Sequence, residues 1–268
     1  MMIIIDIDDY LFVTNYIVFN GGEVQTTFDE YFPPTAENIR IEAILKNSDD
    51  VMSLIQVAET IKETFPDVKR NLVLKYFPYA RQDRKCQPRE TFAFKIFANL
   101  INSLNFAEVE VWDLHNEDVA YLINNVRLVK QKDLVRKLEK GYDLICLPDA
   151  GAHKKYVSHN AKTLIKGSKV RDVETGEITK TVYECRESLE GKKILIVDDL
   201  ADNGMTFYYL AEQLRKEKPR KIDLYVTHAI FKNGIGKLPE VIDNILTTDS
   251  LGKIKPNVVI LNPKIKGL

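Results

Sequence analysis

The sequence has few of the features that cross-link a chain or keep it unfolded. Only 3 of its 268 residues are cysteine, and they form no CxxC pair, which argues against a disulfide framework and against a zinc site. Glycine (12) and proline (10) are also scarce, and no segment is of low complexity. We therefore expect a globular protein of a reducing compartment, the cytoplasm.

An excess of charge of one sign is missing as well. Lys plus Arg (38) nearly equals Asp plus Glu (39), so the net charge is -1 and no global field attracts nucleic acid or an anionic membrane. Neither is expected as a partner, and any phosphate binding must be local. The apolar run at 1–13 contains three aspartates and lacks a basic region, so we interpret it as a first core strand rather than as a signal peptide or membrane span.

The chain does contain a regular alternation of β-branched runs and helical stretches. The strand-like runs lie at residues 71–78, 108–114, 142–149, 192–199 and 221–229, and the helical stretches lie at 89–104, from 150 and from 206. This rhythm predicts an α/β fold with parallel sheets covered by helices and with ligand sites at the carboxyl ends of the strands. We place a boundary near residue 130, which gives domains 1–130 and 131–268.

The sharpest motif is ILIVDDLADNGMT (194–206), an apolar strand that ends in two acids and is followed by a tight turn and a helix start. Adjacent carboxylates suit ribose hydroxyls or their bound metal, and backbone N–H groups at a helix start suit a phosphate. Asp198 and Asp199 are the candidates for the ribose. The candidates for the phosphate are Asp202, Asn203, Gly204, Met205 and Thr206. The alternative is that all of these are turn and N-cap residues without a ligand.

This stretch resembles the phosphoribosyl-pyrophosphate (PRPP) signature shared by type I phosphoribosyltransferases and ribose-phosphate pyrophosphokinases, also called PRPP synthetases. Four further segments resemble only the second family: FNGGEVQ (19–25), YFPYARQDRK (76–85), WDLHNEDV (112–119) and LPDAGAHKKY (147–156). The chain is identified as a short, divergent member of that family. The resemblance implies two related phosphoribosyltransferase-type, Rossmann-like halves. It also implies magnesium-dependent transfer of the pyrophosphoryl group of ATP to the anomeric hydroxyl of ribose 5-phosphate, which yields PRPP and AMP for nucleotide biosynthesis.

The second segment carries the candidate ATP-binding residues. Arg81 and Arg84 offer planar forks for phosphate oxygens, whereas Gln82 and Asp83 offer an amide and a carboxylate for nucleotide edges. The alternative is a charged surface loop that follows a strand and binds nothing. By resemblance, Glu23 joins the ATP site from a neighbouring subunit or segment.

The candidate metal ligands follow two of the strands. His115 comes at the end of the strand EVEVWDL, and Asp149 comes directly after the strand DLICLP. A strand-end histidine is otherwise usually structural, but the resemblance implies that His115 and Asp149 bind Mg²⁺ together with ATP and that His115 also meets an ATP phosphate.

A polar segment at 163–184 reads as two alternating runs joined by a turn, and we expect an extended hairpin that we call the arm. By resemblance, Lys169 and Arg171 of the arm are the catalytic cations. Residues at i and i+2 of a strand point to the same face, so both would stabilise charge on the transferring group. The alternative is a solvated surface ribbon. The family further implies a homo-oligomer, either a dimer or a hexamer.

Three positions depart from the family pattern. Gly21 stands where the family favours Asp, and Asn203 and Met205 stand where it favours Thr and Gly. Met205 places a bulky side chain beside the 5′-phosphate site, so a larger acceptor such as ADP-ribose is an alternative to ribose 5-phosphate.

The sequence leaves two other functions open. A phosphoribosyltransferase would need neither the segment 81–84 nor His115. A catalytically silent regulatory partner of a true synthetase would be expected to lose Lys169, Arg171 or the metal ligands, and all of these are present.

Overall fold

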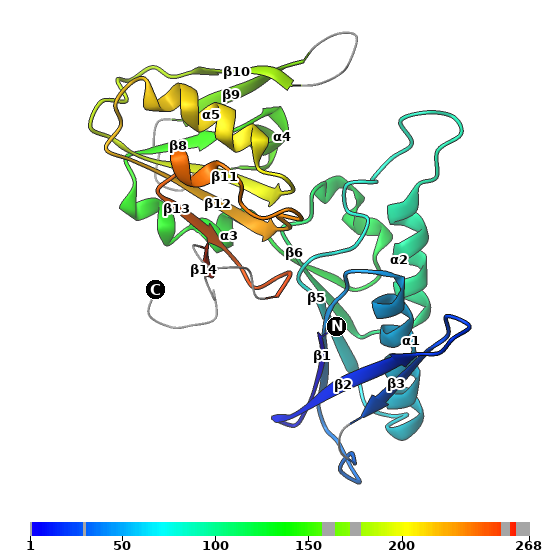
Figure 1. Cartoon of the computed structure of the whole chain (residues 1–268). Helices are drawn as coiled ribbons and strands as arrows, with labels where there is room; N and C mark the ends of the chain where they lie inside the picture. The colour runs from blue at the N-terminus through cyan, green and yellow to red at the C-terminus, as the bar shows by residue number, and fades with distance from the viewer. Residues whose placement is uncertain (1, 29–30, 157–163, 172–177, 253–257, 261–268) are drawn as a thin grey trace. The chain divides into compact units, whose positions relative to one another are not determined.

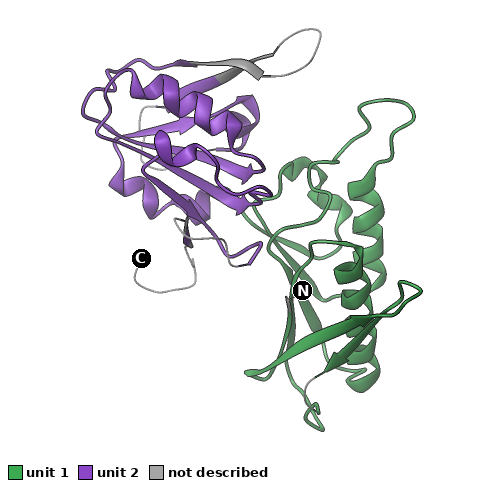
Figure 2. Ribbon diagram, in the orientation of Figure 1, with its two compact units in different colours: residues 1–129 green, residues 130–268 purple. Residues whose placement is uncertain are grey.

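The computed structural model describes residues 2–28, 31–156, 164–171, 178–252 and 258–260 (Figure 1). The chain divides into two compact units, Met1–Val129 and Lys130–Leu268 (Figure 2). Each unit is built around one sheet that has seven strands among the described residues. The predicted α/β class is confirmed.

Unit 1 has the strand order β3-β2-β1-β4-β5-β6-β7. Its strands are β1 (Met2–Ile7), β2 (Tyr10–Val18), β3 (Val24–Phe28), β4 (Ile39–Ile44), β5 (Arg70–Leu74), β6 (Glu108–Trp112) and β7 (Val126–Val129). Its helices are α1 (Ser48–Thr64), α2 (Ala93–Ser103) and the 3₁₀ turn η1 (Glu117–Leu122). β4 to β7 pair in parallel, as expected, whereas β1, β2 and β3 pair antiparallel.

The expected single strand at 1–13 is wrong, because the chain reverses within it. Asp8 and Asp9 have φ values of 51° and 70°, and together they turn β1 into β2. Aspartate tolerates this left-handed conformation better than most residues, and two such residues in succession are typical of a tight hairpin. The acids that exclude a membrane span therefore also make the turn.

The core of unit 1 lies between one face of its sheet and the two long helices. Alternate residues of β1 (Ile3, Ile5 and Ile7) are buried in the same cluster as one stripe of α1, in which apolar residues recur at helical spacing. Asn47 caps α1, since its side chain accepts a hydrogen bond from Asp50 N at 2.8 Å. This packing holds the carboxyl ends of β5 and β6 at one edge.

Unit 2 has the strand order β10-β9-β8-β11-β12-β13-β14. Its strands are β8 (Leu144–Leu147), β9 (Leu164–Arg171), β10 (Ile178–Glu184), β11 (Lys193–Ala201), β12 (Lys221–Ala229), β13 (Asn244–Thr247) and β14 (Val258–Ile260). Its helices are α3 (Gln131–Val135), α4 (Ala150–Lys155) and α5 (Met205–Arg215), with 3₁₀ turns η2 (Leu138–Gly141) and η3 (Leu238–Glu240).

Both faces of the second sheet are covered. Ile194 and Ile196 of β11 pack in the cluster that contains α5, whereas Leu195 and Val197 pack in the cluster on the side of α3 and α4. All neighbouring strands pair in parallel except β9 and β10, which form an antiparallel hairpin. The hairpin expected at 163–184 is confirmed, and its turn (172–177) lies outside the described residues.

Candidate active site

The two adjacent acids of the sharpest motif lie in the last part of β11. The strand continues to Ala201, so the expectation that it ends at the acids is wrong by two residues. Asp199 is 7% exposed, and its backbone N–H donates to Oδ1 of Asp198 at 2.9 Å. Asp198 is half-buried, so it is more accessible than Asp199.

A left-handed glycine joins β11 to α5. Gly204 caps the helix with φ 78°, and a Cβ atom at this position would lie 2.7 Å from Cδ1 of Leu238. The backbone angle therefore favours glycine, and any side chain here would also require the Leu238 side chain to shift. α5 begins at Met205, one residue before the expected start, and Met205 N donates to Oδ1 of Asn203 at 3.2 Å.

The start of α5 is open to solvent. Asp202 and Asn203 are exposed, Thr206 is half-buried, and the Met205 side chain is 38% exposed. The first N–H groups of a helix have no partner within the helix and favour an anion beyond its end. The loop 202–206 thus leads into an open helix start, and its role as a phosphate cup stays a prediction.

Asp149 lies at the same edge of this sheet. β8 pairs in parallel with β11, and Cys146 is opposite Ile196, so Asp149 and Asp199 each come three residues after that pair. Asp149 caps α4, with Oδ1 accepting from Ala152 N at 3.0 Å. On α4, burial and then the nearby charge of Lys166 lower the pKa of His153.

The arm approaches this edge closely through its backbone. A Cβ atom on Gly167 of β9 would lie 2.8 Å from the carbonyl oxygen of Pro148, the residue before Asp149. Lys169 and Arg171 belong to β9, but their side chains lie outside the described residues. Their catalytic role stays a prediction.

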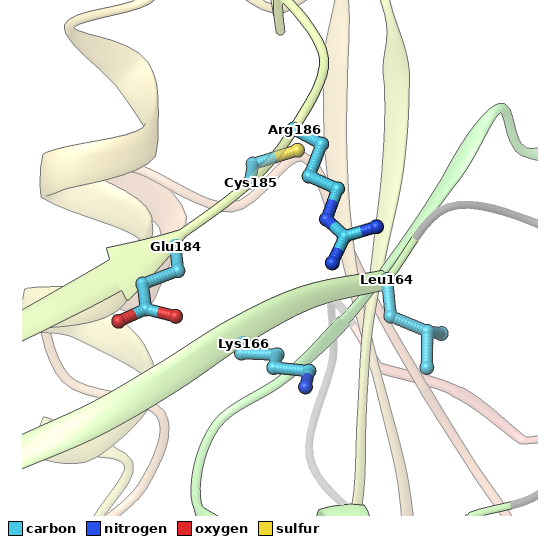
Figure 3. A pocket seen from close by; sticks show the side chains of 5 residues that line it. All are labelled: Leu164, Lys166, Glu184, Cys185 and Arg186. Atoms are coloured by element: carbon cyan, nitrogen blue, oxygen red, sulfur yellow. The ribbon is translucent and has the colours of Figure 1, made fainter.

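A pocket of about 510 Å³ lies at the base of the arm (Figure 3). It is lined by Leu164, Lys166, Glu184, Cys185 and Arg186. None of these described lining residues was predicted as a site residue, and both signs of charge are present. None of the predicted acceptor residues is among these described lining residues.

In unit 1, the candidate ATP segment follows β5 in a tight turn. Tyr79 has φ 64°, and Gln82 N donates to its carbonyl oxygen at 2.8 Å. Arg81, Gln82 and Arg84 are exposed, whereas Asp83 is only 7% exposed. The Asp83 carboxylate, expected at a nucleotide edge, is therefore mostly buried, and ATP binding by the exposed side chains stays a prediction.

Asp83 contacts the loop that follows the next strand. Asn116 Nδ2 donates to Asp83 Oδ2 at 2.5 Å, and Asn116 also caps η1. His115, directly before it, is exposed. The structure thus brings the segments 81–84 and 115–116 together at the carboxyl ends of β5 and β6. Asn116 was not predicted, although it belongs to the segment WDLHNEDV that carried the resemblance.

Glu23 lies in the turn between β2 and β3. Phe19 N donates to the Glu23 carbonyl oxygen at 2.9 Å, and Gly22 has φ 92°. The Glu23 side chain is exposed, and its carboxylate covers Gly21, where an added Cβ would lie 2.4 Å from Oε2. Any side chain at position 21 would therefore displace this carboxylate.

The described residues contain no group of three or more His, Cys, Asp or Glu side chains arranged to hold a metal ion. Mg²⁺ usually takes only one or two protein carboxylates together with water and substrate phosphates, so a magnesium site at Asp149 stays a prediction. His115 belongs to the other unit, so its pairing with Asp149 stays a prediction.

In the part of the chain that the structure describes, no helix has the length and apolarity needed to cross a membrane.

Two family models match the chain in succession. Residues 11–104 match the N-terminal domain of ribose phosphate pyrophosphokinase, and residues 147–251 match the phosphoribosyl transferase domain. The chain belongs to the ribose-phosphate pyrophosphokinase family. The predicted family is thereby confirmed, as is the prediction that the protein is an enzyme.

Curated members of the ribose-phosphate pyrophosphokinase family align with nearly all of the chain. The ribose-phosphate pyrophosphokinase of Mycoplasmopsis pulmonis is 26% identical over 251 residues, which cover 88% of this chain and 76% of that protein. The enzyme of the same name from Pasteurella multocida is 24% identical over 259 residues, which cover 91% and 80%.

A solved structure shows the same fold. Phosphoribosylpyrophosphate synthetase from Mycobacterium smegmatis superposes with a TM-score of 0.76 at 20% identity, covering 95% of this chain and 87% of that one. The two-sheet architecture is therefore that of a known ribose-phosphate pyrophosphokinase fold.

Proposed function

We propose that this protein transfers the pyrophosphoryl group of ATP to the anomeric hydroxyl of ribose 5-phosphate, forming PRPP and AMP. The observation that carries the proposal is the succession of both family domains in one chain, with an Asp198–Asp199 pair that leads into the N-terminus of α5. A phosphoribosyltransferase domain alone would leave residues 11–104 unexplained.

The acceptor is expected to bind to unit 2. The carboxylates of Asp198 and Asp199 accept hydrogen bonds from ribose hydroxyls, and the first N–H groups of α5 donate hydrogen bonds to the 5′-phosphate. Gly204 lets the backbone approach that phosphate because it has no side chain. The five residues 202–206 then enclose the phosphate, mainly through their backbone.

ATP is expected to bind to unit 1. The exposed guanidinium groups of Arg81 and Arg84 pair with phosphate oxygens, and Gln82 binds a nucleotide edge. Asp83 holds the loop through Asn116 and leaves His115 exposed beside it. Glu23 adds a carboxylate from the β2–β3 turn, supplied by this subunit or by a second one in a homo-oligomer.

In the reaction, the anomeric oxygen of the acceptor attacks the β-phosphorus of ATP. The bond from that phosphorus to the α,β-bridging oxygen breaks, AMP departs with the bonding electron pair, and the hydroxyl proton passes to solvent. Lys169 and Arg171 stabilise the charge that builds on the transferring oxygens. Mg²⁺, when bound with ATP near Asp149, would neutralise phosphate charge.

The product identity tests this proposal. ³¹P NMR and chromatography of a reaction with Mg-ATP and ribose 5-phosphate should show AMP and PRPP in equal amounts, and omission of Mg²⁺ should abolish both. Formation of ADP would mean attack at the γ-phosphorus and would contradict the assignment. Absence of any turnover would favour a silent regulatory partner.

A second acceptor is favoured by one observation. The exposed Met205 side chain stands at the start of α5, beside the predicted phosphate cup, so the cup has an apolar surface next to it. A larger acceptor such as ADP-ribose would undergo the same transfer at the same hydroxyl.

A further inference from the structure

A nearly buried cation stands against one of the two acids of β11. The Nζ atom of Lys155, at the C-terminal end of α4, lies 3.5 Å from Oδ2 of Asp199. The side chains of the two residues are only 9% and 10% exposed. Burying such a pair removes two charges from water and often brings no net stability over apolar residues. Its presence at a ligand site therefore calls for an explanation other than stability.

The helix that carries Lys155 is held at both ends. At its start, Asp149 Oδ1 accepts a hydrogen bond from Ala152 N at 3.0 Å. At its end, the buried Tyr156 donates from its hydroxyl to Oε1 of Glu139 at 2.6 Å, and Glu139 is fully buried. The backbone of Lys155 is therefore fixed, and so is the position from which its ammonium group reaches Asp199.

The carboxyl edge of this sheet carries several acids. Asp149, Asp198, Asp199 and Asp202 follow β8 or lie in and after β11. A ribose phosphate that binds here brings a further negative charge, and like charges disfavour each other most where water is excluded. A fixed cation among these acids lowers that repulsion.

We propose that Lys155 is a positioning residue of the acceptor site. It orients the Asp199 carboxylate toward the ribose hydroxyls and offsets the charge of that carboxylate, so that an anionic ribose phosphate binds beside it. The inference rests on the proposed function, because it assigns Lys155 to the same acceptor site. Lys155 acts through Asp199, so its removal weakens acceptor binding more than it slows the chemical step.

Steady-state kinetics of purified full-length variants test this inference. Lys155→Met removes the charge, Lys155→Gln removes the charge but keeps a hydrogen-bond donor, and Lys155→Arg keeps both. Lys154→Met is the matched control, because Lys154 is exposed and precedes Lys155 on the same helix. Thermal melting by circular dichroism accompanies each measurement and reports whether the variant is folded.

We expect Lys155→Met and Lys155→Gln to raise the KM for ribose 5-phosphate about tenfold or more, which corresponds to the loss of one charge-assisted contact. The KM for Mg-ATP and kcat should stay within about threefold, a separation that general loss of structure would not produce. Lys155→Arg should restore the acceptor KM, and Lys154→Met should leave all three constants unchanged.

An unchanged acceptor KM in the Gln variant would overturn the inference, even if the Met variant did not fold. A similar rise in both KM values together with a fall in kcat and a lower Tm would also overturn it, because Lys155 would then only support the fold. A wild-type protein that forms no PRPP contradicts the proposed function instead. The two failures are therefore distinguishable.

Discussion

Asn116 donates a hydrogen bond from Nδ2 to the buried carboxylate of Asp83 at 2.5 Å and so ties together two loops that are 33 residues apart. The first loop carries the exposed arginines of the ATP segment, and the second carries His115. Because Asp83 is only 7% exposed and its contact with Arg84 Nε is long, at 3.9 Å, the carboxylate without Asn116 would be partly desolvated and poorly compensated.

Asn116→Ala should therefore weaken ATP binding without removing any group that touches ATP. A hydrogen bond to a charged group is worth about 1.5 to 3 kcal/mol, so we expect the KM for ATP to rise roughly tenfold or more. Steady-state kinetics at saturating acceptor check this, with the exposed Asn124→Ala as control. An unchanged KM would mean that the ATP segment does not depend on this link.

The catalytic pair of the arm should act mainly in the transition state. We expect Lys169→Ala and Arg171→Ala each to lower kcat by about 100-fold or more and to leave ATP affinity within a few-fold. Rapid-quench kinetics and equilibrium binding of ATP measure the two effects separately. Lys232→Ala, an exposed lysine of the same unit, serves as control. Near-normal turnover in both variants would mean that these two residues have no catalytic role and that the arm is a surface hairpin.

Gly204→Ala should destabilise the start of α5 for two reasons. The alanine would have to adopt a left-handed backbone angle, and its methyl group would meet Leu238. Gly191 is the matched control, because it has a similar φ of 69° but nothing within 4 Å of an added Cβ. Both variants are expected to lose about 1 kcal/mol of stability because alanine disfavours positive φ, and Gly204→Ala is expected to lose about 1 kcal/mol more because Leu238 must shift. Urea unfolding compares them, and equal free energies of unfolding would contradict the predicted contact.

Met205 should decide between the two acceptors. If its exposed side chain marks an opened cup, wild type will convert ADP-ribose with a higher kcat/KM than ribose 5-phosphate, and Met205→Gly will shift the preference toward the smaller acceptor. If the backbone N–H groups keep the cup closed, ribose 5-phosphate will be preferred by both proteins. Parallel assays at saturating Mg-ATP measure the ratio. The first result would overturn our choice of acceptor while leaving the transfer chemistry intact.

Strand positions were predictable where the apolar pattern is long. The run expected at 221–229 is observed as β12 with the same bounds, and the arm appears as two paired strands. The direction of pairing was not predictable for β1 to β3, because a strand buried on one face alternates in the same way whichever direction its neighbour runs. The turn at Asp8 and Asp9 could have been found from its two adjacent acids, since such residues tolerate positive φ.

Site residues were predictable where they are close together in the sequence. The motif 194–206 indicated acids and a glycine at the end of one strand. It gave no sign that Lys155 pairs with Asp199, because 44 residues separate them and a lysine in a polar segment is normally solvated. Contacts of this kind depend on how strands are ordered in the sheet, which the local pattern does not encode.

The close approach of β9 to Pro148 has a consequence for how this enzyme can diverge. The arm and the strand that presents Asp149 are held at a spacing that leaves no room for even a single methyl group at position 167. Substitutions elsewhere along the arm can therefore vary its charge, but a side chain at position 167 would require β9 or the backbone of Leu147 and Pro148 to shift. Glycine at this position thus keeps β9 in close contact with the segment that leads to Asp149.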